Sequence, residues 1–160
     1  MTRFKYLVGC LFALLVIFGS VHSALSQTPK NKIYAQKLVD ETIAKHPDLL
    51  VLAMHVTPPN GSDNIIIASN IGRIGKKADE DDLRVVQTGK SNLEINKKGD
   101  RFEVELVLQD NSGKTIGALG TVFAYKPGDK ESDFNDRAEK IRDELRKQIT
   151  SLEKLFEPIQ

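Results

Sequence analysis

The sequence is poor in cysteine and tryptophan, and it has no strong excess of either charge. Its single cysteine is Cys10, so the chain beyond the first 26 residues can form no disulfide, thiolate metal site or cysteine nucleophile. The 23 basic and 22 acidic residues give a net charge of +1, without the clustered positive charge that is typical of nucleic-acid-binding proteins. We therefore expect no nucleic-acid partner and a fold that depends on an adequate apolar core.

An apolar run long enough to cross a bilayer is also missing. The longest one, residues 6–18, is well short of the ~20 residues that a membrane-spanning helix needs. Arg3 and Lys5 precede it and small residues follow it up to Ser26, which is the pattern of a secretion signal. We predict a signal peptide over residues 1–26, one mature domain over residues 27–160, and a periplasmic or secreted location. Because disulfides are absent, a bacterial protein is favoured.

Two alternatives to simple cleavage remain open for this segment. Residues 7–10 (LVGC) resemble a lipoprotein cleavage box, but they precede most of the apolar run. An uncleaved segment would instead anchor the protein, so the membrane is a partner only if the signal is retained.

Beyond the signal, apolar spacing predicts alternating helices and strands. Helical spacing covers residues 33–43 before Pro47, a short helix is predicted over residues 79–87 with Leu83 and Val86 facing inward, and a long amphipathic helix over residues 132–156. Strands are predicted over residues 49–56, 65–68, 93–95, 102–109 and 115–125.

The strand pattern indicates an α+β fold. Turn residues between the strands predict hairpins and therefore an antiparallel five-stranded sheet, with the helices packed on one face. Gly117 and Gly120 lie inside the last predicted strand, where glycine indicates a bend or the close approach of another segment.

Three stretches resemble the Cache domains, which are PAS-like extracytoplasmic sensor modules. They are residues 65–76 (IIIASNIGRIGK), residues 102–107 (FEVELV) and residues 108–119 (LQDNSGKTIGAL). The resemblance implies a small-molecule pocket between the sheet and the segment before the third strand. The aromatic-Arg-aromatic signature of amino-acid-binding members is missing, and no second apolar span follows residue 125. We therefore expect a stand-alone form without its own output module and leave the ligand class open.

The loop over residues 70–77 supplies the predicted ligand contacts. We expect Arg73 to pair with an anionic group of the ligand, Asn70 to hydrogen-bond to it, and Phe123 or Tyr125 to line the wall. The complete predicted set is Arg73, Asn70, His55, Ser69, Lys76, Phe123 and Tyr125. The alternative is a solvated loop whose cations are neutralised by the acids at residues 79–82.

No pattern predicts catalysis, a cofactor or a metal site. Glu103 and Glu105 share one face of a strand at roughly 7 Å, a spacing that acid–base catalysis can use, but the wet face of a half-buried strand explains them as well. His46 and His55 lack a helical His-x-x-x-His pair or nearby cysteines. We expect a periplasmic small-molecule binding or sensing domain. The alternatives are an accessory protein that contacts an envelope or membrane receptor partner, and an enzyme of unknown reaction.

Overall fold

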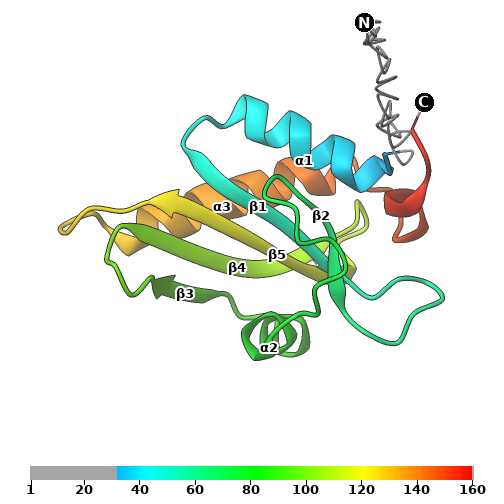
Figure 1. Cartoon of the computed structure of the whole chain (residues 1–160), viewed down its shortest axis with the longest axis horizontal. Helices are drawn as coiled ribbons and strands as arrows, with labels where there is room; N and C mark the ends of the chain where they lie inside the picture. The colour runs from blue at the N-terminus through cyan, green and yellow to red at the C-terminus, as the bar shows by residue number, and fades with distance from the viewer. Residues whose placement is uncertain (1–31, 160) are drawn as a thin grey trace, which may run out of the picture.

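The computed structural model describes residues 32–159, and the predicted signal peptide lies outside them. The elements run in the order α1 (Tyr34–Lys45), β1 (Leu49–Val56), β2 (Ile65–Ser69), α2 (Glu80–Thr88), β3 (Asn92–Ile95), β4 (Arg101–Gln109), β5 (Thr115–Ala124), α3 (Glu131–Arg146) and a 3₁₀ turn, η1 (Glu153–Phe156). Figure 1 shows them in space.

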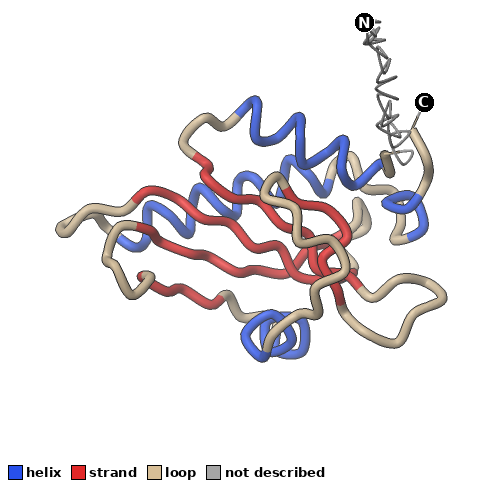
Figure 2. Tube along the Cα trace, in the orientation of Figure 1, coloured by secondary structure: helices blue, strands red, loops and turns tan. Residues whose placement is uncertain are grey.

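The five strands form one antiparallel sheet in the order β2-β1-β5-β4-β3. The strands that come first and last in the sequence, β1 and β5, are therefore neighbours in the middle of the sheet, and β2 and β3 are its edge strands. This arrangement confirms the predicted α+β fold, a five-stranded antiparallel sheet with an N-terminal helix, a short middle helix and a longer C-terminal helix. Figure 2 shows helices on both sides of the strands.

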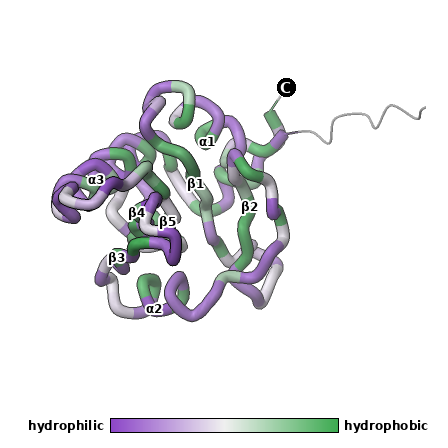
Figure 3. Tube along the Cα trace, turned by 60° about the vertical axis from the view of Figure 1, so that its left-hand side comes forward, coloured by the Kyte–Doolittle hydropathy of each residue, from purple (hydrophilic) through white to green (hydrophobic). Residues whose placement is uncertain are grey.

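One face of the sheet carries the main core. The even-numbered residues of β4 from Phe102 to Leu108 are at most 1% exposed and pack with residues of α1 and α3. Phe102 stacks on Phe134 of α3 with ring centroids 4.8 Å apart, and Phe134 also meets Phe123 at 5.8 Å. The apolar residues of β1 and β2 are coloured as hydrophobic in Figure 3, and Leu52 and Met54 of β1 are fully buried in this core.

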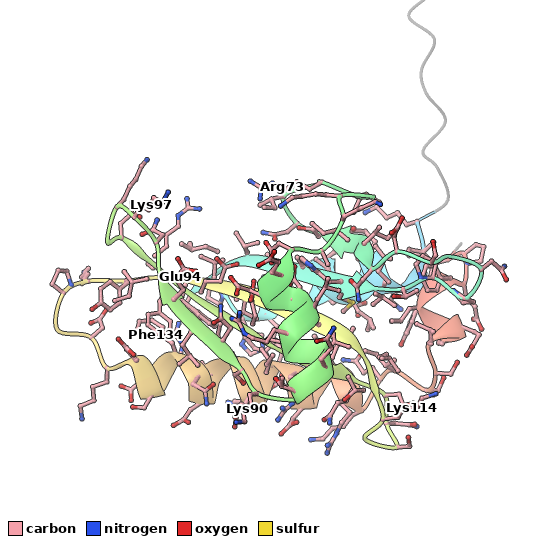
Figure 4. All side chains as sticks on the ribbon, turned by 90° about the horizontal axis from the view of Figure 1, so that it is seen from below. Arg73, Lys90, Glu94, Lys97, Lys114 and Phe134 are labelled. Carbon is pink, nitrogen blue, oxygen red and sulfur yellow. The ribbon has the colours of Figure 1, made fainter. Side chains whose placement is uncertain are left out.

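The other face is covered by α2, which corrects the expectation that the helices share one face. Val85 of α2 packs on Val107 of β4 and Ala118 of β5 in a separate small cluster. Side chains alternate between the two faces of a strand, so Val107 points away from Leu106 and Leu108. Figure 4 shows α2 lying across this face, which we call the outer face. The orientation of α2 also differs from the prediction, because Leu83 is 40% exposed whereas Val85 is fully buried.

The predicted helix over residues 132–156 is shorter in the structure. It ends at Arg146, and η1 follows as a separate turn. The carbonyl of Ile149, a buried residue, accepts a hydrogen bond from the backbone N–H of Asn111 in the β4–β5 turn at 2.7 Å. The Ile149 carbonyl is therefore bonded to the β4–β5 turn and not to a later residue of a helix. The apolar spacing of the sequence continues past Arg146, but the backbone no longer forms an α-helix there. Within residues 32–159, no helix combines the length and the apolarity that membrane crossing requires.

Candidate ligand-binding site

A cavity of about 190 Å³ lies on the outer face of the sheet, beside α2. Its walls come from β1, β2, β4, β5, the segment between β2 and α2, and the first turn of α2. The lining residues are Val51, Ala53, His55, Ile66, Ser69, Ile71, Arg73, Lys76, Asp79, Asp82, Glu103, Glu105 and Gly120. The segment that carries Arg73 is visible above α2 in Figure 4.

Small residues on the central strands leave room for this cavity. Ala53 of β1 is paired with Gly120 of β5, and Gly120 is also paired with Glu105 of β4. A Cβ placed on Gly120 would meet nothing closer than 4.0 Å. The position beside Gly120 is therefore open space, and no neighbouring segment lies close to its Cα. Gly117 is different, because a Cβ there would lie 2.2 Å from the carbonyl oxygen of His55. The predicted close approach therefore occurs at Gly117.

The first turn of α2 places two carboxylates at the cavity. Asp79 is the N-cap, and its Oδ1 accepts from the backbone N–H groups of Asp81 and Asp82 at 3.2 and 3.3 Å. Asp82 Oδ2 accepts in return from the backbone N–H of Asp79 at 3.1 Å. This reciprocal capping box fixes both side chains at the helix start. It orients Asp82 toward the sheet, where its residue is only 1% exposed.

His55 lies beside Asp82 on the sheet side of the cavity. Its Nδ1 lies 2.7 Å from Asp82 Oδ2, but this buried nitrogen is not aligned for a hydrogen bond and has no hydrogen-bond partner among residues 32–159. His55 is on the outer face because it is paired with Ala118 of β5. The other Asp82 oxygen, Oδ1, is buried and has no hydrogen-bond partner in the part of the chain from residue 32 to residue 159. The capping box thus uses one oxygen of Asp82 and leaves the second one without a partner among residues 32–159.

Two glutamates of β4 add negative charge to the same cavity. Burial, together with the nearby carboxylates of Asp82, Glu103 and Asp79, raises the pKa of Glu105 to about 8. Burial also raises the pKa of Glu103, followed by the charges of Glu94 and Asp79. Glu105 Oε2 accepts a hydrogen bond from Asn92 Nδ2 at 3.3 Å. Like charges this close favour the protonated acid, and a bound cation would favour the carboxylate instead.

Three of these acids converge on one point. One ligand atom from each of Asp79, Asp82 and Glu105 lies within 4.8 Å of the others. Oxygen-only clusters of this kind can hold a hard divalent cation or the hydrogens of an ammonium group. The structure therefore brings together a potential cation site that no pattern in the sequence indicates, and no metal was expected here from the sequence.

Positive charge is found at the exposed side of the cavity. Arg73 and Lys76 both line it and are exposed, and within residues 32–159 neither forms an ion pair. Their segment is tied to β2, since the N–H of Ile66 donates to Lys76 O at 2.9 Å and the N–H of Gly75 donates to Ile66 O at 2.8 Å. Arg73 has a left-handed backbone with φ of 66°, which is uncommon for a residue with a side chain.

The predicted ligand set divides into three groups. His55, Ser69, Arg73 and Lys76 line the cavity. Asn70 does not: its side chain accepts from Leu52 N–H at 2.9 Å and donates to Leu50 O at 3.0 Å. That side chain therefore continues the edge of the sheet.

Phe123 and Tyr125 were predicted as wall residues, and this prediction is wrong. Phe123 is paired with Phe102 and is fully buried in the core under α3. Tyr125 packs against the same core, 6.0 Å from Phe134 between ring centroids. Odd-numbered positions of β5 from Leu119 onward face this core, so the outer face receives Gly120 and Val122 instead.

The acids that line the cavity were not predicted from the sequence as ligand residues. Asp79 and Asp82 were interpreted as neutralising helix-start charges, and Glu103 and Glu105 as the wet face of a strand. In the structure Glu105 is only 7% exposed. The available signal was the Asp-x-x-Asp spacing, which is compatible with a reciprocal helix cap and therefore fixes the direction of Asp82. The covering of the outer face by α2 had no comparable signal.

Comparisons with known proteins give likenesses of fold only. No family model matches the sequence, and no curated protein matches it. Among solved structures, the chain is similar to the inducer-binding domain of the transcription factor PobR from Acinetobacter, a double mutant in complex with 3-hydroxybenzoic acid. The identity is 12%, the TM-score is 0.48, and the match covers 76% of this chain and 98% of that one. A light-oxygen-voltage domain matches with 17% identity and a TM-score of 0.31, over 62% of this chain and 93% of the other.

Proposed function

We propose that this protein is a small-molecule binding or sensing domain whose ligand carries a positive charge and occupies the outer-face cavity. The observation that carries the proposal is the lining: four carboxylates, Asp79, Asp82, Glu103 and Glu105, share the cavity with only two permanent cations. Burial and mutual repulsion raise the pKa values of both glutamates. A cationic ligand relieves this repulsion, so its binding is favoured over that of an anion.

The two cations at the mouth define a second part of the ligand. Arg73 and Lys76 have no acidic partner within residues 32–159, and Arg73 presents a planar fork suited to a carboxylate. An anionic group of the same ligand would lie there, as the sequence predicted for Arg73. The combination describes a small zwitterion, with its ammonium group toward Asp82 and Glu105 and its carboxylate toward the loop.

The size of the cavity limits the ligand further. Its volume of about 190 Å³ is below the roughly 300–1,000 Å³ of pockets for drug-sized molecules. A ligand of a few heavy atoms therefore fits, whereas a flavin-sized or nucleotide-sized one does not.

A binding screen with the purified protein in EDTA tests this proposal. We expect small amines and α-amino acids to raise the thermal midpoint by about 2 °C or more, because ligand binding to the native state stabilises it. Matched carboxylates without an amine should leave the midpoint unchanged. Binding of carboxylates alone, or no binding across all three series, would overturn the cationic assignment.

A pair of variants locates the binding. Glu105→Gln keeps the size of the side chain and removes its charge, so it should weaken amine binding about tenfold. Glu80→Gln is the matched control, because Glu80 is exposed in the same first turn of α2 but does not line the cavity. Equal affinities for the two variants would show that the amines bind elsewhere.

We also propose that the domain works outside the cytoplasm. The proposal is supported by Arg3, Lys5 and the apolar residues 6–18. Expression of the full chain in a bacterium, followed by fractionation and mass measurement, should give a periplasmic product lacking about 26 residues. An intact chain in the cytoplasm would contradict it.

A further inference from the structure

The acids of the cavity are arranged around a point rather than spread along its walls. Asp79 and Asp82 come from the first turn of α2, and Glu105 comes from β4 on the opposite wall. One ligand oxygen from each lies within 4.8 Å of the other two. Oxygens bound to one calcium ion at 2.3–2.6 Å are at most about 5 Å apart, so the observed separations agree with a shared ion.

Asp82 provides a second, independent observation at the same point. Its Oδ1 is buried and has no hydrogen-bond partner in residues 32–159, although the residue is only 1% exposed. The partner oxygen is held by the Asp79 N–H at 3.1 Å and lies 2.7 Å from His55 Nδ1. A buried carboxylate oxygen without a partner is costly. The fixed side chain therefore keeps one unsatisfied oxygen in a residue that lines the cavity.

We propose that Asp79, Asp82 and Glu105 bind a divalent metal ion of the oxygen-preferring class, with Ca²⁺ and Mn²⁺ as the best fits. The inference rests on the proposed binding of a cation in this cavity, and it adds that a metal ion occupies the acidic end when no ligand ammonium group is there. All three ligands are carboxylates, which suit Ca²⁺, Mg²⁺ and Mn²⁺ rather than the softer ions that prefer thiolates.

The neighbouring residues support the three ligands. Asn92 donates to Glu105 Oε2 at 3.3 Å, and the N–H of Asp79 donates to Asp82 Oδ2 at 3.1 Å; metal-binding carboxylates are commonly held by such hydrogen bonds. Asp79 is exposed, so the ion reaches the cluster from solvent without local unfolding. Glu103 adds charge to the same cavity.

Mn²⁺ tests the site directly, because it broadens the NMR signals of nearby amides. The probe is manganese chloride, titrated into ¹⁵N-labelled protein freed of metal with EDTA, in about 0.15 M salt to suppress weak surface binding. We expect the amide signals of residues 79–82 and 105 to broaden first, and calorimetry with calcium chloride to show one site. The thermal midpoint should rise with the calcium concentration.

Three variants and one control distinguish this site from a general acidic surface. Asp82→Asn and Asp79→Asn keep a side-chain oxygen for the helix cap, and Glu105→Gln keeps an acceptor for Asn92. Each should weaken Ca²⁺ binding at least tenfold, while Glu80→Gln should leave it unchanged. If a variant does not fold, the other two and the broadening pattern in the wild-type protein still decide the question.

The outcomes separate this inference from the proposed function. Binding of amines in EDTA without any Ca²⁺ or Mn²⁺ binding at residues 79–82 and 105 overturns the metal site and leaves the cationic ligand in place. Failure of both amines and metal ions overturns both proposals. Metal binding that broadens other amides, or that survives in all three variants, also overturns the metal site.

Discussion

The two faces of the sheet bury different kinds of side chain. On the face that packs against α1 and α3, the buried strand residues are apolar except for Thr121. On the outer face, which α2 covers, the carboxylates of Asp82 and Glu105 are buried. Thr121 satisfies its hydroxyl by donating to Val104 O at 2.8 Å. On the outer face, Asp82 Oδ1 has no such partner. A tightly packed face with satisfied polar groups gives stability. The outer face instead combines small residues, buried acids and a cavity, which are features of a binding site.

The comparison is tested most strongly by truncating an aromatic residue of the packed face. Phe123 is fully buried and packs on Phe134, so Phe123→Ala should lower the free energy of unfolding by about 3–5 kcal/mol. Urea denaturation followed by circular dichroism measures this loss. If the variant still folds, its Ca²⁺ or amine affinity should match that of the wild-type protein, because Phe123 lies on the opposite side of the sheet from the cavity.

The packed face is also the part that the sequence predicts well. The alternation of Phe102, Val104, Leu106 and Leu108 sets both the strand and its buried face, and local hairpin turns set the antiparallel pairing. The same period predicts a wet face for Glu103 and Glu105, because it cannot show that α2 returns to cover them. Phe123 was predicted to line the pocket, but it faces the core under α3. Both faces of the sheet are covered by helices, so the hydrophobicity of a side chain does not show which face it points to.

The second test changes a buried acid of the outer face. The folded protein holds the pKa of Glu105 at about 8, against 4.5 for the unrestrained side chain. The folded state therefore binds an extra proton between these values, and the stability from this group is complete below pH 4.5 and is lost as the pH rises through about 8. Glu105→Gln cannot lose a proton. It should exceed the wild-type stability by up to about 5 kcal/mol at pH 9 and come close to it near pH 5.

Urea denaturation in EDTA at pH 5, 7 and 9 measures this difference. EDTA is required because a bound cation would stabilise the Glu105 carboxylate. Glu80→Gln serves as the control, since Glu80 is exposed and should leave the pH profile of the wild-type protein unchanged. Parallel profiles for Glu105→Gln and the wild-type protein would mean that Glu105 is solvated like an ordinary surface acid.

The third test fills the cavity without touching a charge. A Cβ on Gly120 has no neighbour nearer than 4.0 Å, and valine suits a strand. Gly120→Val should therefore change the free energy of unfolding by less than about 1 kcal/mol while weakening amine or Ca²⁺ binding at least tenfold by calorimetry. Gly117→Val is the contrasting variant. Its Cβ would lie 2.2 Å from a backbone oxygen of His55, so it should cost about 1–3 kcal/mol or more. Equal losses of stability would contradict the distinction between empty space at Gly120 and close approach at Gly117.

The smallest expected effect concerns the orientation of α2 on the outer face. Helical spacing alone predicted that Leu83 faces inward, but Leu83 is 40% exposed, and Val85 is buried against Val107 and Ala118. Leu83→Ser should thus change the free energy of unfolding by about 0.5 kcal/mol or less, whereas Val85→Ala, two residues along the same helix, should lower it by about 1–2 kcal/mol. Urea denaturation of both variants in one buffer gives the comparison. A larger loss for Leu83→Ser would mean that α2 is rotated from the orientation described here, and Asp82 would then no longer point into the cavity, because the same helix turn carries both residues.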